Sequence, residues 1–175
     1  ITIGPTYPYR GGISHYNMLL SENLNKRHQV KAISFKFLYP KFLFPGENQR
    51  DDASKEQIKI ESEHLINSIN PFNWLNVFRR IKRERPDLTI FYWWTPFFAP
   101  IDTALTFLIK RFTKSKILFL CHNVVPHEKR KVDRILTKLS LRNADYFIVH
   151  STEDMNNLKR LIPNANVKLG FHPTY

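Results

Sequence analysis

The sequence predicts an α/β protein with a doubly wound, mostly parallel, Rossmann-like sheet. Short, continuous apolar segments recur along the chain, as expected of strands that are covered on both faces. Amphipathic segments, with apolar residues three and four positions apart, lie between them, and the links are short. The 175 residues are enough for one such domain, and we expect residues 1–175 to form it.

The elements follow one another in regular alternation. Six strands are predicted, at residues 1–4, 29–35, 88–94, 117–121, 146–150 and 167–171. Amphipathic helices are predicted from the stripes Ile13-Tyr16-Leu20-Leu24, Ile101-Ala104-Leu105-Leu108-Phe112 and Val132-Ile135-Leu136-Leu139, and from Met155-Leu158-Ile162 after a capping signal at Ser151. Residues 36–70 interrupt the alternation and are predicted to form a long excursion, because loops of that length are usually functional or mobile.

The composition favours an anionic partner. Lys and Arg number 27 against 15 Asp and Glu, a formal charge of +12, which suits nucleic acid, acidic lipid headgroups or phosphorylated substrates. The single cysteine, Cys121, excludes an intramolecular disulfide. The longest apolar stretch is interrupted by Pro100 and Asp102, so no run of residues is long enough to cross a bilayer.

The first candidate site is the turn between the first strand and the first helix, residues 4–12. Gly11 and Gly12 allow the backbone to approach a ligand closely, and the N–H groups at the start of a helix favour a phosphate. Arg10 is the cation beside them. The turn has neither the dinucleotide fingerprint nor the P-loop sequence. A purely structural turn fits the spacing equally well.

The second candidate site follows the predicted strand 117–121. Ligands of open α/β sheets bind beyond the carboxyl ends of the strands, which is where His122 and Asn123 lie, with His127 and Glu128 close behind. An imidazole there can donate a hydrogen bond to a sugar or phosphate, or move a proton. The spacing of the two histidines, broken by a proline, disfavours a metal site. The alternative is that His122 only caps the strand and the others are solvated.

The third feature is a basic helix with an aromatic neighbour. Apolar residues at positions 74, 77, 78 and 81 share one face, and Arg79, Arg80, Lys82 and Arg83 crowd the other, as in helices that lie on acidic lipid. Phe42 and Phe44 belong to an aromatic segment that suits a membrane interface or a hydrophobic acceptor. An ordinary core-facing helix with a solvated basic back explains the same pattern.

The order of these motifs resembles the N-terminal, acceptor-side domain of a GT-B-fold glycosyltransferase of family 4. The resemblance rests on residues 8–16, 24–30, 121–123 and 144–151, and covers essentially the whole chain. It implies a retaining enzyme that transfers a sugar from a nucleotide-sugar to a saccharide or lipid-linked acceptor in glycan or glycolipid synthesis. It also implies that Gly11 and Gly12 lie against the donor, that His122 is the catalytic contact to the donor sugar, and that no cofactor or essential metal is needed.

The resemblance also sets limits on this chain. The family builds its nucleotide-sugar pocket mainly from a second, C-terminal domain with a paired-glutamate motif, and these 175 residues contain no such motif. We therefore expect that domain to be absent from this chain, and the chain alone to be inactive. We expect a cytoplasmic protein, with the inner face of the membrane as the surface for its basic helix. The alternative is a non-catalytic basic module that binds a phosphorylated or nucleic-acid ligand. The sequence contains no recognised nucleic-acid-binding motif. If the chain belongs to a transferase, we expect it to bind no nucleic acid.

Overall fold

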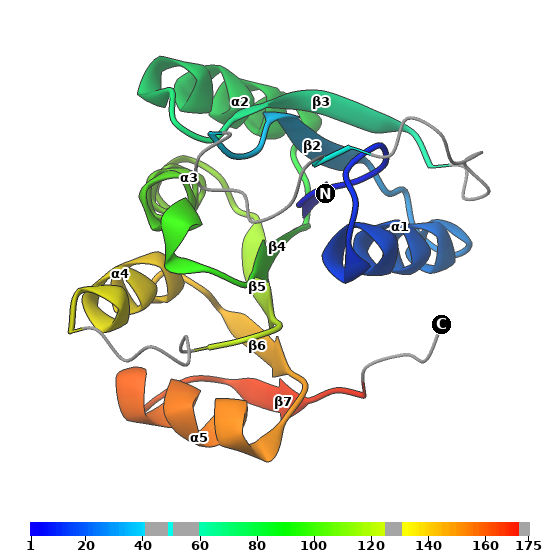
Figure 1. Cartoon of the computed structure of the whole chain (residues 1–175). Coiled ribbons are helices and arrows are strands. Elements are labelled where there is room, and N and C mark those ends of the chain that lie inside the picture. The colour runs from blue at the N-terminus through cyan, green and yellow to red at the C-terminus, as the bar shows by residue number, and fades with distance from the viewer. Residues whose placement is uncertain (41–48, 51–59, 125–130, 172–175) are drawn as a thin grey trace. The chain divides into compact units, whose positions relative to one another are not determined.

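The computed structural model describes residues 1–40, 49–50, 60–124 and 131–171 (Figure 1). Within these ranges the elements are β1 (Thr2–Ile3), α1 (Gly12–Asn25), β2 (Ala32–Phe37), β3 (Ser62–Asn67), α2 (Pro71–Glu84), β4 (Leu88–Trp93), the 3-10 turn η2 (Pro96–Phe98), α3 (Ala99–Phe112), β5 (Lys116–Cys121), α4 (Lys131–Leu141), β6 (Tyr146–Val149), α5 (Thr152–Leu161) and β7 (Val167–Leu169). The chain divides into two compact units, residues 1–73 and 74–175.

Unit 1 carries three parallel strands in the order β3-β2-β1. Thr2 pairs with Ala32 and Ile33 pairs with Glu63, and α1 is the crossover between β1 and β2. The apolar side chains of β2 are buried, which is why a short strand such as β1 is held beside it. Unit 1 therefore contains the predicted strand–helix–strand arrangement.

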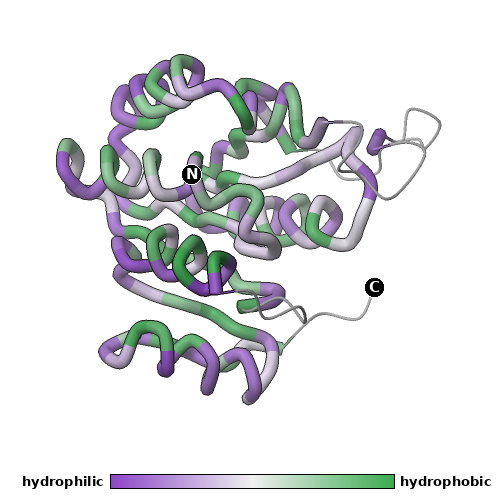
Figure 2. Tube along the Cα trace, turned by 60° about the vertical axis from the view of Figure 1, so that its left-hand side comes forward, coloured by the Kyte–Doolittle hydropathy of each residue, from purple (hydrophilic) through white to green (hydrophobic). Residues whose placement is uncertain are grey.

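Unit 2 carries four parallel strands in the order β4-β5-β6-β7. Three phenylalanine rings stack across neighbouring strands, with centroid distances of 5.2 Å between Phe91 and Phe119 and 6.4 Å between Phe119 and Phe147. The crossover helices α3 and α4 pack against each other, as Figure 1 shows. Hydrophobic and hydrophilic stretches alternate along the helices (Figure 2). The continuous apolar strands thus form the core of unit 2, and the α/β, Rossmann-like class with parallel strands is confirmed.

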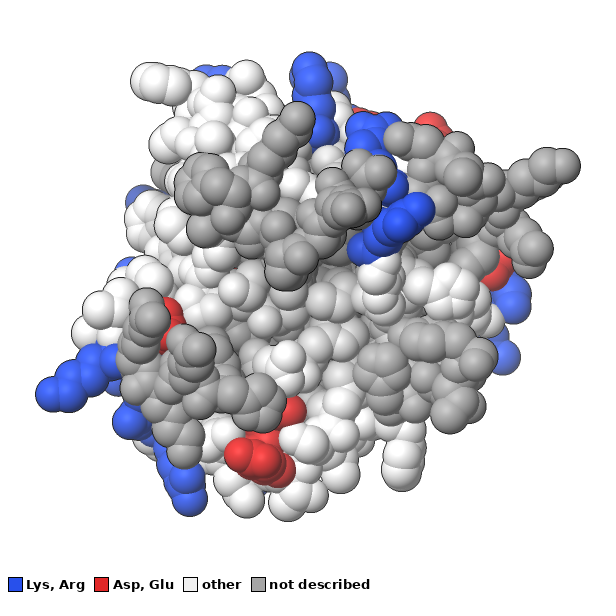
Figure 3. Space-filling view, in the orientation of Figure 1, with Lys and Arg blue, Asp and Glu red and all other residues white. Residues whose placement is uncertain are grey.

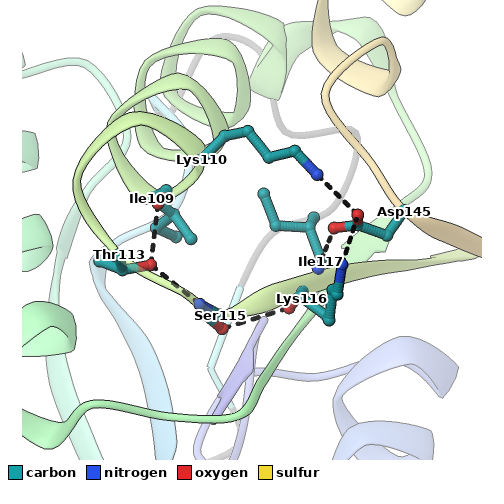
Figure 4. A network of polar contacts seen from close by, with 7 residues as sticks. All are labelled: Ile109, Lys110, Thr113, Ser115, Lys116, Ile117 and Asp145. Carbon is teal, nitrogen blue, oxygen red and sulfur yellow. Dashed lines mark hydrogen bonds and ion pairs between the residues drawn. The ribbon is translucent and has the colours of Figure 1, made fainter.

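A network of hydrogen bonds and ion pairs connects the amino-terminal ends of β5 and β6 (Figure 4). The Asp145 carboxylate accepts a hydrogen bond from the Ile117 N–H at 2.9 Å and pairs with the Lys110 ammonium at 2.6 Å and the Lys116 ammonium at 3.6 Å. Burial tends to raise the pKa of Asp145, but the bonds from Lys110 and Ile117 outweigh it and the pKa is lowered. The network is structural, since ligands of parallel sheets bind at the opposite, carboxyl ends.

The strand β3 was not predicted, and it corrects part of the long excursion assigned to residues 36–70. Only Leu65 and Ile66 are aliphatic in this strand, and within unit 1 it pairs with β2 alone, as an edge strand does. An edge strand that is exposed on one side lacks the continuous apolar run by which buried strands are recognised. Residues 41–48 and 51–59 of the excursion lie outside the described residues.

Two predicted helices exist but bury a face other than the apolar one. In α1 Tyr16 of the predicted stripe is buried, but Ile13, Leu20 and Leu24 are only half-buried, and the other buried residues are Ser14, Asn17, Met18 and Ser21. In α4 the buried residues are Thr137, Ser140 and Leu141, whereas Val132 and Ile135 are 62% and 59% exposed. The stripe predicted for α1 is therefore right as a core contact only at Tyr16, and the stripe predicted for α4 is wrong at Val132 and Ile135, because both helices bury polar residues that hydrogen-bond to neighbouring elements.

None of the helices in the described residues has the length and hydropathy of a membrane span.

Candidate active site

The predicted glycine turn lies in unit 1, between β1 and α1. Gly11 is the residue before the helix and has a φ of 113°, a value that favours glycine. Among the described residues, a β-carbon added at Gly11 or Gly12 meets no atom within 4 Å, so both positions border space that the described part of the chain leaves open. No side chain caps the helix and its first turn has no acidic residue. The positive end of the helix and the exposed side chain of Arg10 together suit an anionic group.

The turn is held in shape by polar groups on three elements. The Thr6 N–H donates to the Ser34 hydroxyl of β2 at 3.0 Å, and the Asn17 amide of α1 donates to the Pro5 carbonyl at 3.0 Å. On β3, the His64 Nε2 lies 2.9 Å from the Tyr7 carbonyl. These contacts explain why α1 buries polar residues such as Asn17 beside the apolar Tyr16 and Met18: the polar residues support the turn. The turn is consequently pre-organised before any ligand arrives.

The second site lies in unit 2, where four strands end in one row. The last paired residues are Trp93, Cys121, Val149 and Leu169, which are in register across β4, β5, β6 and β7. His122, His150 and Gly170 each follow one of these residues. The His122 N–H donates to the Trp93 carbonyl at 2.9 Å, and the Gly170 N–H donates to the Val149 carbonyl at 2.8 Å. His122 is therefore at the carboxyl ends of the strands, as its place in the sequence predicts.

Four residues form what we call the histidine row: Tyr92, His122, His150 and Gly170. The His122 ring is stacked against Tyr92 at 6.1 Å and 15° and lies 5.2 Å from the His150 ring. His150 Nδ1 in turn lies 3.3 Å from the Gly170 carbonyl. The ring of His122 is half-buried and its Nε2 atom is buried. Direct contact with a substrate therefore uses Nδ1, or requires movement of the groups that cover Nε2.

Only glycine fits at position 170, the last residue of the histidine row. A β-carbon at this position would lie 2.8 Å from Ile148 Cγ2, closer than real β-carbons approach other atoms. Only glycine lets the chain after β7 approach β6 so closely. The sequence prediction missed the roles of His150 and Gly170, because both fell inside predicted strands. The signal that could have identified them is that each directly follows an apolar run, where a histidine or a glycine marks the end of the strand.

The segment after His122 is fastened to the start of α5. Asp154 Oδ1 accepts from the Val124 N–H at 2.8 Å, and its Oδ2 accepts from the Ser151 hydroxyl at 2.7 Å. Ser151 also accepts from the Asp154 N–H at 3.0 Å and so caps the helix, as predicted. Asn123, between the two fixed residues, is exposed. The backbone that carries His122 is thus fixed on both sides, and the exposed amide of Asn123 is accessible.

Two buried acidic groups, Cys121 and Asp102, lie near this edge, and burial raises the pKa of each. Burial raises the pKa of the Cys121 thiol, and the charge of Asp154 raises it further, which disfavours the nucleophilic thiolate. Burial also raises the pKa of Asp102 well above its usual range. Asp102 Oδ2 has no hydrogen-bond partner within the part of the chain that is described. The sequence reading treated Asp102 only as a break in an apolar run.

The two predicted sites lie in different units, and the expectation that they share one ligand stays a prediction. His127 and Glu128, predicted beside His122, lie outside the described residues. In residues 1–40, 49–50, 60–124 and 131–171, no three His, Cys, Asp or Glu side chains are arranged to hold a metal ion. The expectation about metal therefore also stays a prediction.

The predicted helix α2 is present, but most of its apolar stripe is buried and not available to lipid. Val77, Phe78 and Ile81 are buried, so α2 is a core-facing helix. The predicted cations are Arg79, which donates to Asn76 at 2.9 Å, Arg80, which pairs with Glu84, Lys82, which lies 5.9 Å from the Phe112 ring centroid, and the exposed Arg83. Phe42 and Phe44 lie outside the described residues. Contact of α2 with lipid stays a prediction, and the buried apolar residues of the helix no longer support it.

Comparison with known proteins connects these features. No curated protein matches the chain. The family model described as Glycosyltransferase Family 4 matches residues 10–169. The match includes Arg10, Gly11 and Gly12 of the turn and nearly all of unit 2, including His122 and His150. It covers most of the chain, so the module is of the glycosyltransferase type and takes part in binding a sugar donor and an acceptor. The chain belongs to glycosyltransferase family 4.

Proposed function

We propose that this chain is the acceptor-side part of a retaining glycosyltransferase that transfers a sugar from a nucleotide-sugar to a saccharide or lipid-linked acceptor. The observation that carries the proposal is the family match over residues 10–169, since it includes Arg10, Gly11 and Gly12 of the turn and His122 of the histidine row. Glycan or glycolipid synthesis is the process that such a transfer would serve. The proposal requires no resident cofactor and no metal.

The glycine turn would bind the anionic part of the donor. Gly11 and Gly12 border open space, and the start of α1 is a positive helix terminus with no acidic residue in its first turn. Arg10 would add a charged hydrogen bond to a phosphate oxygen. Because the turn is held by Ser34, Asn17 and His64, little ordering would accompany binding.

The histidine row would orient the donor sugar. His122 would contact a sugar hydroxyl through its imidazole, and Asn123 would supply an amide beside it. The ring contacts with Tyr92 and His150 limit the movement of the imidazole, so the hydrogen bond would already be aimed before the transition state forms. We extend the proposal to His127 and Glu128, which follow His122 closely in the sequence.

The nucleotide would be held chiefly by a further domain with the family's paired glutamates. We therefore predict that the 175-residue chain alone releases no nucleotide from a nucleotide-sugar, and that activity appears only with that domain present. Transfer by the purified chain alone would contradict this part of the proposal.

A nucleotide-release assay tests the function directly. The protein that carries this chain together with a donor domain is incubated with a panel of nucleotide-sugars and a glycolipid extract, and free nucleotide is measured. We expect release with one donor, and a product whose anomeric proton coupling in NMR is that of the donor. An inverted product would refute retention, and no release with any donor would refute the transferase.

The alternative is a non-catalytic basic module, which the charge of +12 favours. Such a module would bind nucleic acid with an affinity that falls linearly in log salt concentration. Nucleic-acid binding without nucleotide release would support it over the transferase.

A further inference from the structure

The outward face of α4 is apolar, which is the reverse of an ordinary core helix. Val132 and Ile135 are 62% and 59% exposed, and Leu139, one turn further, is half-buried. Their spacing of three and four residues places them on one side of the helix. Figure 2 is turned so that the side of unit 2 carrying α3 and α4 comes toward the viewer, and green stretches are visible on it.

The buried polar residues on the inward face of α4, Thr137 and Ser140, both make hydrogen bonds. The Ser140 hydroxyl donates to the Ala99 carbonyl at 3.2 Å and lies 3.4 Å from the Thr103 hydroxyl of α3. The Thr137 hydroxyl, also fully buried, donates to the Asp133 carbonyl at 2.6 Å. A rotation of α4 that buried Val132 and Ile135 would break the contacts with α3. The exposure of the apolar residues is therefore fixed by the packing of unit 2.

Cations flank the apolar residues. Lys131 and Lys138, seven residues apart, share one flank of the helix, Arg134 lies near them, and Arg142 directly follows the last residue of α4. All four are exposed, and no ion pair joins any of them to another residue in the described ranges. Figure 3 shows blue side chains projecting on the left, over the side of unit 2 that carries α4 and α5.

We propose that the outward face of α4 docks on an anionic lipid surface. Apolar side chains flanked by Lys and Arg are what an interfacial helix presents to lipid: the apolar groups enter the headgroup boundary and the cations meet acidic headgroups. A nucleic acid would use the cations but gain nothing from exposed valine and isoleucine. The proposal deepens the proposed function by naming the surface that would meet a lipid-linked acceptor, and it rests on that function only for its purpose.

The α4 face differs from the α2 face in the way that matters for insertion. On α2 the central apolar residues are buried, and only Phe72 and Leu75, at 86% and 39% exposure, remain outside. On α4 the exposed Val132 and Ile135 lie among cations that form no ion pair within the described residues, Lys131, Arg134 and Lys138. The two helices therefore provide matched test sites within one chain.

Vesicle co-sedimentation of the full protein that carries this chain tests the proposal. The vesicles contain three parts phosphatidylcholine to one part phosphatidylglycerol. The double substitution Val132→Ser with Ile135→Ser leaves the charge unchanged, and we expect it to lower the partition coefficient about tenfold. The matched control, Phe72→Ser with Leu75→Ser, is expected to bind like the wild type. Circular dichroism confirms that each variant is folded.

Fluorescence gives a second readout that does not depend on the amount of bound protein. Cys121 is fully buried, so the variant Ile135→Cys carries one accessible thiol for an environment-sensitive dye. We expect a blue shift of the dye when phosphatidylglycerol vesicles are added. Sedimentation of the α4 double variant at the wild-type level, a greater loss in the α2 control, or binding to RNA in place of vesicles would overturn the proposal. Neither readout needs a nucleotide-sugar, so failure of the transferase assay leaves this test intact.

Discussion

Asp102 on α3 should make the stability of this protein fall as the pH rises. Its carboxyl is 7% exposed, and burial raises its pKa well above the usual range. In the unfolded chain the same group has a pKa of about 4. Between the two pKa values the folded state therefore binds more protons than the unfolded state, by up to one. Stability is complete below the unfolded pKa and is lost progressively as the pH rises toward the folded pKa.

The magnitude follows from one proton. A difference of one bound proton changes the free energy of unfolding by about 1.4 kcal/mol per pH unit. Asp102→Asn has nearly the same shape and does not titrate, so it removes this contribution. Where the pH lies well above the unfolded pKa and well below the folded pKa, the wild type should lose stability relative to the Asn variant at close to this rate. Other titrating groups are common to both proteins and cancel in the comparison.

Urea denaturation, followed by tryptophan fluorescence at several pH values, measures the difference. Asp87→Asn is the matched control, because that carboxylate is exposed in the link before β4. We expect the control to follow the wild type with the same dependence on pH. Parallel curves for the wild type and Asp102→Asn would refute the reasoning, since they would mean that Asp102 is ionised in the folded protein.

Three further substitutions test the geometry. Gly11→Ala should cost about 1 kcal/mol of stability, because alanine is strained at a φ of 113°, whereas Gly12→Ala, inside the helix, should not destabilise; equal unfolding midpoints for the two would contradict this. Gly170→Ala should cost about 1–3 kcal/mol in thermal unfolding, since the β-carbon would lie 2.8 Å from Ile148; an unchanged midpoint would contradict the close approach. Asp145→Asn should remove stability that is present above the unfolded pKa and lost as the pH falls through the lowered folded pKa, so its urea midpoint should approach the wild-type value in acid; a constant gap would be inconsistent with the ion pairs.

Much of the fold could be predicted from the sequence because most strands here are buried. Runs such as residues 117–121 are continuous and apolar, and they end where the polar site begins. β3 escaped prediction because Ser62, Glu63 and His64 give it no apolar pattern, although His64 supports the glycine turn. Periodicity detects burial, and β3 is held by pairing with β2 and by polar contacts.

The position of the candidate site could be predicted from the sequence, but only some of its residues could. His122 follows an apolar run directly, so its location at a strand end could be deduced, whereas His150 and Gly170 fell inside runs whose ends were placed one or two residues too late. The faces of α1 and α4 could not be deduced. Which side of a helix is buried depends on what its neighbours offer, and here they offer hydrogen-bonding groups, as Asn17 shows on α1 and Ser140 on α4.

The most direct test of the account is the turnover of the complete enzyme after substitution of His122. Sugar transfer is measured with saturating donor and acceptor for the wild type, His122→Ala and the control His28→Ala, an exposed histidine between α1 and β2. The account predicts a loss of about a hundredfold or more in kcat for His122→Ala and no loss for His28→Ala. A folded His122→Ala enzyme that turns over like the wild type would contradict it.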